Sequence, residues 1–180
     1  MSEEFVSRII SLRADIDNES AGDVIDKILF INELDSEIPV DERLPIHLHI
    51  QSGGGCCADG YALVDIIETS ETPIYTYCDG YVDSTATDIY LAGDKRYVYP
   101  HSTFLFHATK MAITESQHLS KLMSSVDYAK HINEFGKQML RDKTKFDEDM
   151  IELIYGGAED FTFYAEEALN CGIATDMICK

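Results

Sequence analysis

A serine, a histidine and an aspartate stand at the edges of predicted elements, where side chains are free to react. Ser84 lies in the segment GYVDSTATDIYLAG, in which a strand gives way to a helix. His107 follows a short strand predicted over 103–106, and Asp160 lies in a loop between two predicted helices. A serine hydroxyl becomes a nucleophile when a base removes its proton, and a third group that orients the base assists this step. The three residue types therefore match the requirements of acyl transfer.

Each of these residues also has a simpler structural interpretation. A serine directly before a helix is most often an N-cap, and a single histidine after a strand is more often a packed or surface residue. Acyl transfer also needs donors that meet the developing oxyanion. The glycines Gly53, Gly54 and Gly55 after the strand IHLHI would expose backbone N–H groups. This run lacks the lysine and the spacing of a phosphate-binding loop.

The elements that must position these residues alternate between strand and helix, which is typical of an α/β fold. Apolar patterns predict strands over 8–13, 46–50, 74–78, 96–99 and 103–106. Helices are predicted from 21 to 34 with Asn18 as the cap, between the glycine run and Pro73, and from the Ser84 turn to residue 92. The pattern then changes to one long helix over about 114–142, which begins with the capping-box sequence TESQ, followed by helices over 147–155 and 165–170.

Composition limits the classes of function. A chain of 180 residues fits one domain, and its net charge of −19 argues against nucleic acid and anionic membrane as partners. It contains no apolar run long enough to span a membrane and no signal-peptide pattern, so we expect a cytoplasmic protein. The five cysteines show no metal-binding spacing. His47 and His49 have the spacing of a metal pair on a strand, but without a third ligand a polar strand face is the favoured interpretation.

The order of these segments resembles the proteolytic subunit of the Clp protease, ClpP. The segment IHLHIQSGGGCCADGYALVDII is similar to that family's strand, glycine-rich loop and helix, usually written INSPGG in its loop. GYVDSTATDIYLAGDKRYVYPHSTFLFH resembles the family's serine segment and its strand ending in histidine, and EDFTFYAEEALNCGIATDMI and SRIISLRADID resemble its two ends. The resemblance spans residues 7–178. It implies a single ClpP-like peptidase domain over 1–180, with a ClpP/crotonase-like core of repeated strand-helix (ββα) units and a late handle helix.

Carried over by position, the resemblance assigns a role to each candidate. Ser84 would be the nucleophile, His107 the general base and Asp160 the residue that orients the base. The backbone N–H groups of Gly55 and Thr85 would form the oxyanion hole. Substrate would be bound by the loop residues Gly53, Gly54 and Cys56. The implied protein is a serine endopeptidase without metal or cofactor, which cleaves peptides or unfolded proteins inside a homo-oligomeric ring.

Several residues depart from the family pattern. Gly53 replaces the proline of the glycine loop, which loosens the segment that would hold a peptide substrate. Asp83 stands where the family has alanine, and Asp88 lies one turn into the following helix; carboxylates here would oppose an oxyanion and shift activity to higher pH. Glu159 replaces a basic residue associated with pairing of two rings. The short segment before Ser7 argues against docking of a Clp-type AAA+ unfoldase.

Two further classes of function are compatible with parts of the pattern. One is a non-catalytic structural subunit of a ClpP-like ring, against which the presence of all three triad candidates argues. The other is an acyl-CoA enzyme of the related crotonase fold, which also builds an oxyanion hole from N–H groups at strand ends. That fold would not need the order Ser, His, Asp, and no basic cluster in this sequence suits the phosphates of CoA.

Overall fold

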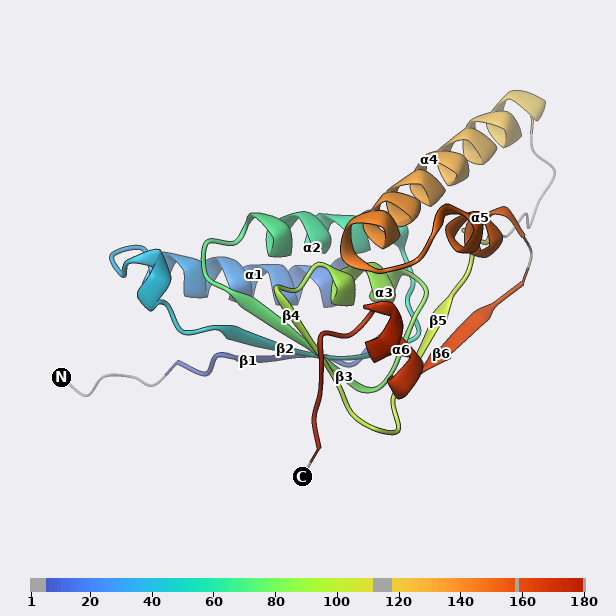
Figure 1. The fold of residues 1–180 in the computed structure, drawn as a ribbon. Coiled ribbons are helices and arrows are strands. Elements are labelled where there is room, and N and C mark those ends of the chain that lie inside the picture. The colour runs from blue at the N-terminus through green and yellow to red at the C-terminus, as the bar shows by residue number, and fades with distance from the viewer. Residues whose placement is uncertain (1–5, 112–117, 158, 180) are drawn as a thin grey trace.

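The computed structural model describes residues 6–111, 118–157 and 159–179. In this part of the chain a seven-stranded sheet is packed against helices (Figure 1), which confirms the predicted α/β class. The strands are β1 (Ile9–Leu12), β2 (Ile46–Ser52), β3 (Ile74–Asp83), β4 (Lys95–Val98), β5 (Thr103–Phe106), β6 (Phe161–Tyr164) and β7 (Asp176–Met177). The helices are α1 (Asn18–Leu34), α2 (Cys57–Thr69), α3 (Thr85–Leu91), α4 (Leu119–Lys143), α5 (Glu148–Gly156) and α6 (Ala165–Cys171), with a 3₁₀ turn η1 (Val40–Glu42).

The sheet divides at strand β3. Five strands run in the order β1-β2-β3-β4-β7 and are parallel. Residues 75–78 of β3 pair with β4, whereas residues 81–83 pair with β5, which in turn pairs antiparallel with β6. Gly80 lies between the two pairing regions and has a φ of +128°, a conformation that other residues rarely adopt. The carboxyl end of β3 therefore leaves β4 and carries the chain toward the β5–β6 pair.

Alternation of buried and half-exposed residues along the strands decides which face of the sheet the helices cover. In β2, Ile46, Leu48 and Ile50 are fully buried, while His47 and His49 between them are half-exposed. Helices α1, α2 and α3 lie together on the buried face (Figure 1). Successive side chains of a strand point to opposite faces, so the histidines lie on the other face.

That opposite face carries a row of stacked rings. His49 stacks on Tyr77 with ring centroids 4.4 Å apart, and Tyr77 stacks on Tyr97 at 4.8 Å. The Nδ1 atom of His47 lies 2.7 Å from the Tyr77 hydroxyl, and the Nδ1 atom of His49 lies 2.9 Å from the Asp79 carboxylate. Within the described ranges, no three His, Cys, Asp or Glu side chains are grouped to hold a metal ion. The two histidines thus take part in a polar, aromatic strand face.

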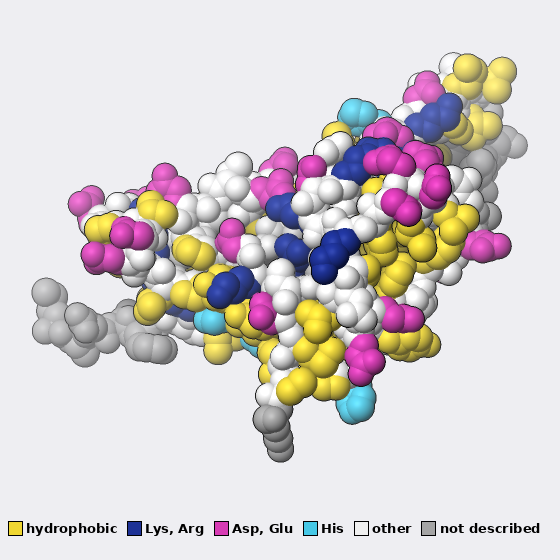
Figure 2. All heavy atoms as spheres, in the orientation of Figure 1, with side chains coloured by type: hydrophobic (Ala, Val, Ile, Leu, Met, Phe, Trp, Pro, Cys, Tyr) yellow, Lys and Arg dark blue, Asp and Glu magenta, His cyan; other side chains and the backbone are white. Residues whose placement is uncertain are grey.

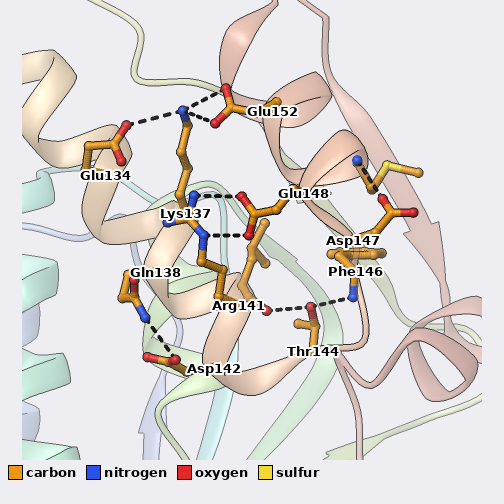
Figure 3. Close-up of polar contacts among 12 residues, drawn as sticks. Glu134, Lys137, Gln138, Arg141, Asp142, Thr144, Phe146, Asp147, Glu148 and Glu152 are labelled. Atoms are coloured by element: carbon orange, nitrogen blue, oxygen red, sulfur yellow. Dashed lines mark hydrogen bonds and ion pairs between the residues drawn. The ribbon is translucent and has the colours of Figure 1, made fainter.

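Helices α4 and α5 are joined by ion pairs (Figure 3). The Lys137 ammonium contacts the Glu152 carboxylate at 2.7 Å, and the Arg141 guanidinium donates two hydrogen bonds to Glu148 at 2.8 and 2.9 Å. Exposed pairs of this kind contribute little stability singly, but the bidentate geometry fixes how the two helices lie. The buried side chains of α5, Ile151 and Ile154, accompany these surface pairs on the same helix.

The long helix predicted over about 114–142 is helix α4. It begins at Leu119, and the TESQ capping box predicted at its start lies outside the described residues. Its buried residues all belong to its second half, where a Cβ atom at Gly136 would overlap the hydroxyl of Tyr155. The first half extends away from the sheet and the other helices (Figure 1).

Most predicted elements agree with the structure, with three differences. Helix α1 is capped by Asp17 rather than Asn18, because the Asp17 carboxylate accepts from the Ser20 N–H at 2.8 Å in a capping box. Strand β3 continues five residues beyond the predicted end, as far as Asp83. Strands β6 and β7 were not predicted. No helix among the described residues is both long and apolar enough to cross a membrane.

Candidate active site

Ser84 joins β3 to α3 through an uncommon backbone conformation. Its φ is +55° and its ψ is −133°, and it is the one described non-glycine residue with a positive φ. Such a conformation costs about 1–3 kcal/mol and persists when neighbours hold it in place. The Ser84 N–H donates to the Leu105 carbonyl at 2.8 Å, and the Ser84 carbonyl accepts from the N–H and the hydroxyl of Thr87 at 2.8 and 2.7 Å. The Ser84 side chain makes no capping hydrogen bond to α3, so a role as helix cap does not explain its hydroxyl.

The glycine loop packs directly against this turn. A Cβ atom at Gly54 would lie 2.6 Å from the Cβ of Ser84, so a glycine is required there. The Ile16 N–H donates to the Gly54 carbonyl at 2.8 Å, and the Cys56 N–H donates to the Ile16 carbonyl at 2.7 Å. The loop is therefore tied on one side to the segment that precedes α1 and touches the serine turn on the other.

Two backbone amides near Ser84 have no protein acceptor among the described residues. They are the N–H groups of Gly55 and Thr85, the predicted oxyanion pair. The Thr85 hydroxyl donates to the Gly55 carbonyl at 3.4 Å, which links the two segments. Both residues line the same cavity as Ser84. The other three loop residues predicted to bind substrate do not line that cavity: Gly53, Gly54 and Cys56, the last of which is exposed.

His107 directly follows β5, as predicted, and lines the cavity with Ser84. Its Nδ1 atom lies 2.6 Å from the carbonyl oxygen of Ala108. Because a carbonyl only accepts, we assign the hydrogen to Nδ1, which leaves Nε2 as the acceptor nitrogen. This is the tautomer that a base needs to accept a proton from a serine hydroxyl. No hydrogen bond in the described part of the chain joins Ser84 to His107.

Asp160 is paired with a lysine and not with His107. The Lys110 ammonium donates to the two carboxylate oxygens of Asp160 at 2.8 and 3.2 Å. This hydrogen bond is the main reason why the pKa of Asp160 lies below its ordinary value, and the Asp160 side chain is 45% exposed. The structure therefore brings Ser84, His107 and the two amides to one cavity. Asp160 does not line that cavity, but its partner Lys110 does, and the charge of His107 also contributes to the lowered pKa of Asp160.

The cavity has a volume of about 220 Å³. Segments from five elements and the loops beside them enclose it, and apolar and polar side chains contribute to its wall. Its lining comprises Gly55, Cys57, Tyr61, Ser84, Thr85, Thr87, Asp88, Phe106, His107, Thr109, Lys110, Ile132 and Tyr155. A space of this size next to a candidate nucleophile is large enough for one amino-acid side chain.

Two carboxylates near the serine are perturbed by burial. Burial raises the pKa of Asp83, while a backbone hydrogen bond from Leu105 and the charge of His107 oppose the shift. Asp88 is buried, with 6% of its surface exposed, and burial raises its pKa to about 7 although a hydrogen bond from Tyr61 opposes the shift. The Tyr61 hydroxyl donates to Asp88 Oδ2 at 3.0 Å, and Asp88 Oδ1 is buried without a hydrogen-bond partner.

Comparison with known proteins agrees with this geometry. The family profile described as Clp protease matches residues 1–180. The "ATP-dependent Clp protease proteolytic subunit 2" of Prochlorococcus marinus (strain MIT 9312) is 27% identical, over 96% of this chain and 82% of that protein. "Proteolytic subunit 3" of the same protease from Parasynechococcus marenigrum (strain WH8102) is 28% identical, over 96% and 83%. A solved ClpP1 mutant from Listeria monocytogenes shares the fold, with a TM-score of 0.81 and 21% identity over 96% of this chain and 92% of that one.

The chain has the α/β fold of the solved ClpP1 mutant. The family match covers the whole chain, so the chain belongs to the Clp protease family and is a ClpP-type peptidase.

The sequence placed Ser84 and His107 at the ends of regular elements, where the structure has them, but it did not predict two features of the structure. The pairing of Lys110 with Asp160 was not predicted, because nothing in the spacing of two residues fifty positions apart indicates contact. Asp88 was noted as a carboxylate near the serine, but its burial and its partner Tyr61 depend on the packing of α2 against α3. A charged residue at an otherwise apolar position of α3 is the one signal that pointed to it.

Burial of Asp88 predicts a pH-dependent stability. The folded pKa of about 7 lies above the ordinary value of 3.8, so the folded state binds the extra proton between these values and loses stability as the pH rises through them. We expect Asp88→Asn to be stabilised relative to wild type at pH 8.5, by about 2–4 kcal/mol more than at pH 4. Urea unfolding at both pH values, at one protein concentration, measures this difference.

The exposed Asp65 provides a matched control for that experiment. Asp65→Asn removes a carboxylate from α2 without touching the cavity, so its difference from wild type should be the same at both pH values. If the difference in unfolding free energy between Asp88→Asn and wild type were also the same at both pH values, Asp88 would not be a buried group with a raised pKa.

Proposed function

We propose that the chain is a serine endopeptidase that cleaves peptide bonds through an acyl-enzyme at Ser84. The observation that carries this proposal is the strained backbone of Ser84. The hydroxyl of this residue does not cap α3, and Ser84 lines the same cavity as His107. A strained strand-to-helix turn exposes a nucleophile in other hydrolases for the same geometric reason. The names of the two cyanobacterial relatives, proteolytic subunits, support the same reaction.

In the proposed mechanism each group around the cavity has one task. His107 Nε2 accepts the proton as Ser84 Oγ attacks the carbonyl carbon of the scissile bond. The N–H groups of Gly55 and Thr85 donate to the oxyanion that develops. The tetrahedral intermediate collapses when the C–N bond breaks and His107 delivers its proton to the leaving amine. A water molecule, deprotonated by His107, then hydrolyses the serine ester and regenerates the hydroxyl.

Asp160 would orient His107 once it is released from Lys110. His107 Nδ1–H donates to the Ala108 carbonyl in the described arrangement, which already selects the correct tautomer. The ion pair with Lys110 keeps Asp160 ionised, the form that can accept from an imidazole N–H. We infer that exchange of the Lys110 contact for a His107 contact completes the triad.

The relatives' names include ATP dependence, but the glycine run of this chain lacks the lysine of a phosphate-binding loop. We infer that any coupling to ATP hydrolysis would come from a separate Clp-type AAA+ unfoldase and that short peptides need no ATP.

Replacement of the nucleophile should abolish turnover. Ser84→Ala is expected to reduce kcat for a fluorogenic peptide by about 10⁶-fold while the far-UV circular dichroism spectrum stays the same, because only a hydroxyl is removed. Labelling of wild type by a fluorophosphonate probe, and its loss in the variant, provides a direct readout. Ser36→Ala, an exposed serine, is the control and should label normally. Normal folding without labelling of wild type would favour the non-catalytic structural subunit.

The Lys110–Asp160 pair gives a second test with opposite outcomes. Asp160→Asn should reduce kcat by about 10⁴-fold, because an amide cannot orient the imidazole correctly. Lys110→Met removes the competing ammonium and keeps the length of the side chain, so kcat/KM should rise. Both variants are assayed with the same peptide. Wild-type activity of Asp160→Asn would remove Asp160 from the mechanism and leave its pair with Lys110 purely structural.

We also propose that the chain assembles into a homo-oligomeric ring through α4. Apolar residues three and four positions apart on its first half lie on one face and are exposed: Leu119 by 71%, Met123 by 59% and Val126 by 41%. This half of the helix extends away from the other elements, and hydrophobic residues are visible at its end in Figure 2. A second copy of the chain, packed against this stripe, would bury it.

Light scattering tests this assembly. Wild type at micromolar concentration should have the mass of a multimer of 20.2 kDa subunits, and Met123→Glu should shift the mass toward that of a monomer, because it places a charge in an apolar contact. Ser124→Glu adds the same charge to the neighbouring exposed position and should leave the mass unchanged. A monomeric wild type would contradict the proposal.

A further inference from the structure

The cavity beside Ser84 contains a carboxylate oxygen without a partner. Asp88 is buried and lines the cavity, and its Oδ1 atom is the one buried side-chain polar atom in the described residues that has no hydrogen bond. No ion pair among those residues includes Asp88, and the one lysine on the cavity wall, Lys110, is bound to Asp160. Burial of an ionised carboxylate oxygen without a partner is unfavourable in free energy, unless a cation or a hydrogen-bond donor pairs with it.

The wall of the cavity combines apolar side chains with polar ones and one buried carboxylate. The rings of Phe106 and Tyr155 and the side chain of Ile132 line it, whereas Asp88 supplies a negative charge. Asp88 lies three residues after Thr85 on α3, which puts the two on one helix face, about 4.5 Å apart along the axis. The carboxylate is therefore nearly a full turn beyond the amide proposed to hold the oxyanion. A ligand with an apolar stem and a terminal cation would contact the apolar side chains of the wall and pair with the carboxylate.

We propose that this cavity binds a lysine side chain, that of the residue whose carbonyl is attacked, and that Asp88 Oδ1 accepts a hydrogen bond from its ammonium group. The inference rests on the proposed function, because it places the scissile carbonyl at Ser84. It names the class of substrate: peptides cleaved on the carboxyl side of lysine. The four methylene groups of lysine contact the apolar wall, as such stems do elsewhere in proteins.

The geometry favours lysine over arginine. Tyr61 already donates to Asp88 Oδ2 at 3.0 Å, so one oxygen remains for the ligand. A guanidinium binds a carboxylate best through two parallel hydrogen bonds, which needs both oxygens. An ammonium is a compact charge with rotatable donors and can use a single oxygen. Apolar side chains of the same length would fill the cavity but leave the carboxylate unpaired.

The preference for lysine should depend on pH. Burial raises the pKa of Asp88 to about 7, so the carboxylate is ionised at pH 8 and protonated at pH 5.5. The protonated form attracts a cation much less, and the preference should therefore weaken as the pH falls through 7. The other titratable groups lining the cavity are Tyr61 and Cys57 from α2, Tyr155 from α5, His107 after β5, and Lys110. Comparison of two substrates on the same enzyme cancels the effect of these groups on the chemical step.

The test compares acetyl-Ala-Ala-X-aminomethylcoumarin substrates in which X is lysine, arginine or norleucine, an analogue of lysine without the amine. At pH 8 wild type should cleave the lysine substrate with a kcat/KM about 30-fold or more above that for norleucine, as expected for a buried charged contact. Asp88→Asn should bring the ratio close to one, and Asp65→Asn should not change it. A ratio near one in wild type, or a ratio unaffected by Asp88→Asn, would overturn the proposal; a higher rate for arginine than for lysine would overturn the choice of cation.

A binding measurement separates failure of this inference from failure of the proposed catalysis. In the Ser84→Ala background, calorimetry compares acetyl-Ala-Ala-Lys-amide with its norleucine counterpart, and no turnover is needed. Tighter binding of the lysine peptide, lost in Ser84→Ala/Asp88→Asn, supports the inference even if wild type hydrolyses none of the substrates. Equal binding of the two peptides overturns it even if wild type proves to be an active peptidase. Circular dichroism of each variant verifies the fold.

Discussion

The backbone conformation of Ser84 is the constraint on which the rest of the cavity depends. Strand β3 ends and α3 begins without a loop, and this is possible because one residue takes a positive φ. Three contacts hold it there: the Leu105 carbonyl from β5, the hydroxyl of Thr87 from α3, and Gly54, where a Cβ atom would overlap Ser84. Of the residues that make these contacts, Thr87 also lines the cavity, together with Ser84 itself. The cost of the strained residue is offset by packing that the fold requires in any case.

The change of partner strand along β3 brings the carboxyl end of this strand, and with it Ser84, next to β5. Before Gly80, strand β3 lies between β2 and β4 in the parallel sheet. After Gly80 it pairs with β5 in place of β4. Helices α4 and α5 contribute Ile132 and Tyr155 to the wall of the cavity. The ion pairs between the same two helices (Figure 3) lie outside the cavity lining. Among the buried side chains of the described residues, Asp88 is the one with a polar atom that has no hydrogen-bond partner.

The sequence correctly predicted those features of the fold that depend on residues close together in the chain. The period of two in IHLHI, the apolar spacing of α4 and the glycine that ends α6 depend on near neighbours, and the structure agrees with each. Strand β6 was missed because FTFY becomes a strand by pairing with β5, more than fifty residues earlier. The same limit applies to the site. Ser84 and His107 stand at the ends of regular elements and were predicted, whereas the partner of Asp160 depends on how distant segments meet.

The stacked rings on the open face of the sheet have a consequence for spectroscopy. The chain has ten tyrosines and no tryptophan, so tyrosine dominates its near-ultraviolet absorption. The rings of Tyr77 and Tyr97 are inclined by 14° and lie on neighbouring strands, with His49 of a third strand stacked beside them. Electronic transitions of rings held in a fixed mutual orientation give a near-ultraviolet circular dichroism signal, which disappears when tertiary packing is lost. The chain therefore carries an intrinsic optical reporter for the ordering of β2, β3 and β4, on the opposite face of the sheet from α1, α2 and α3.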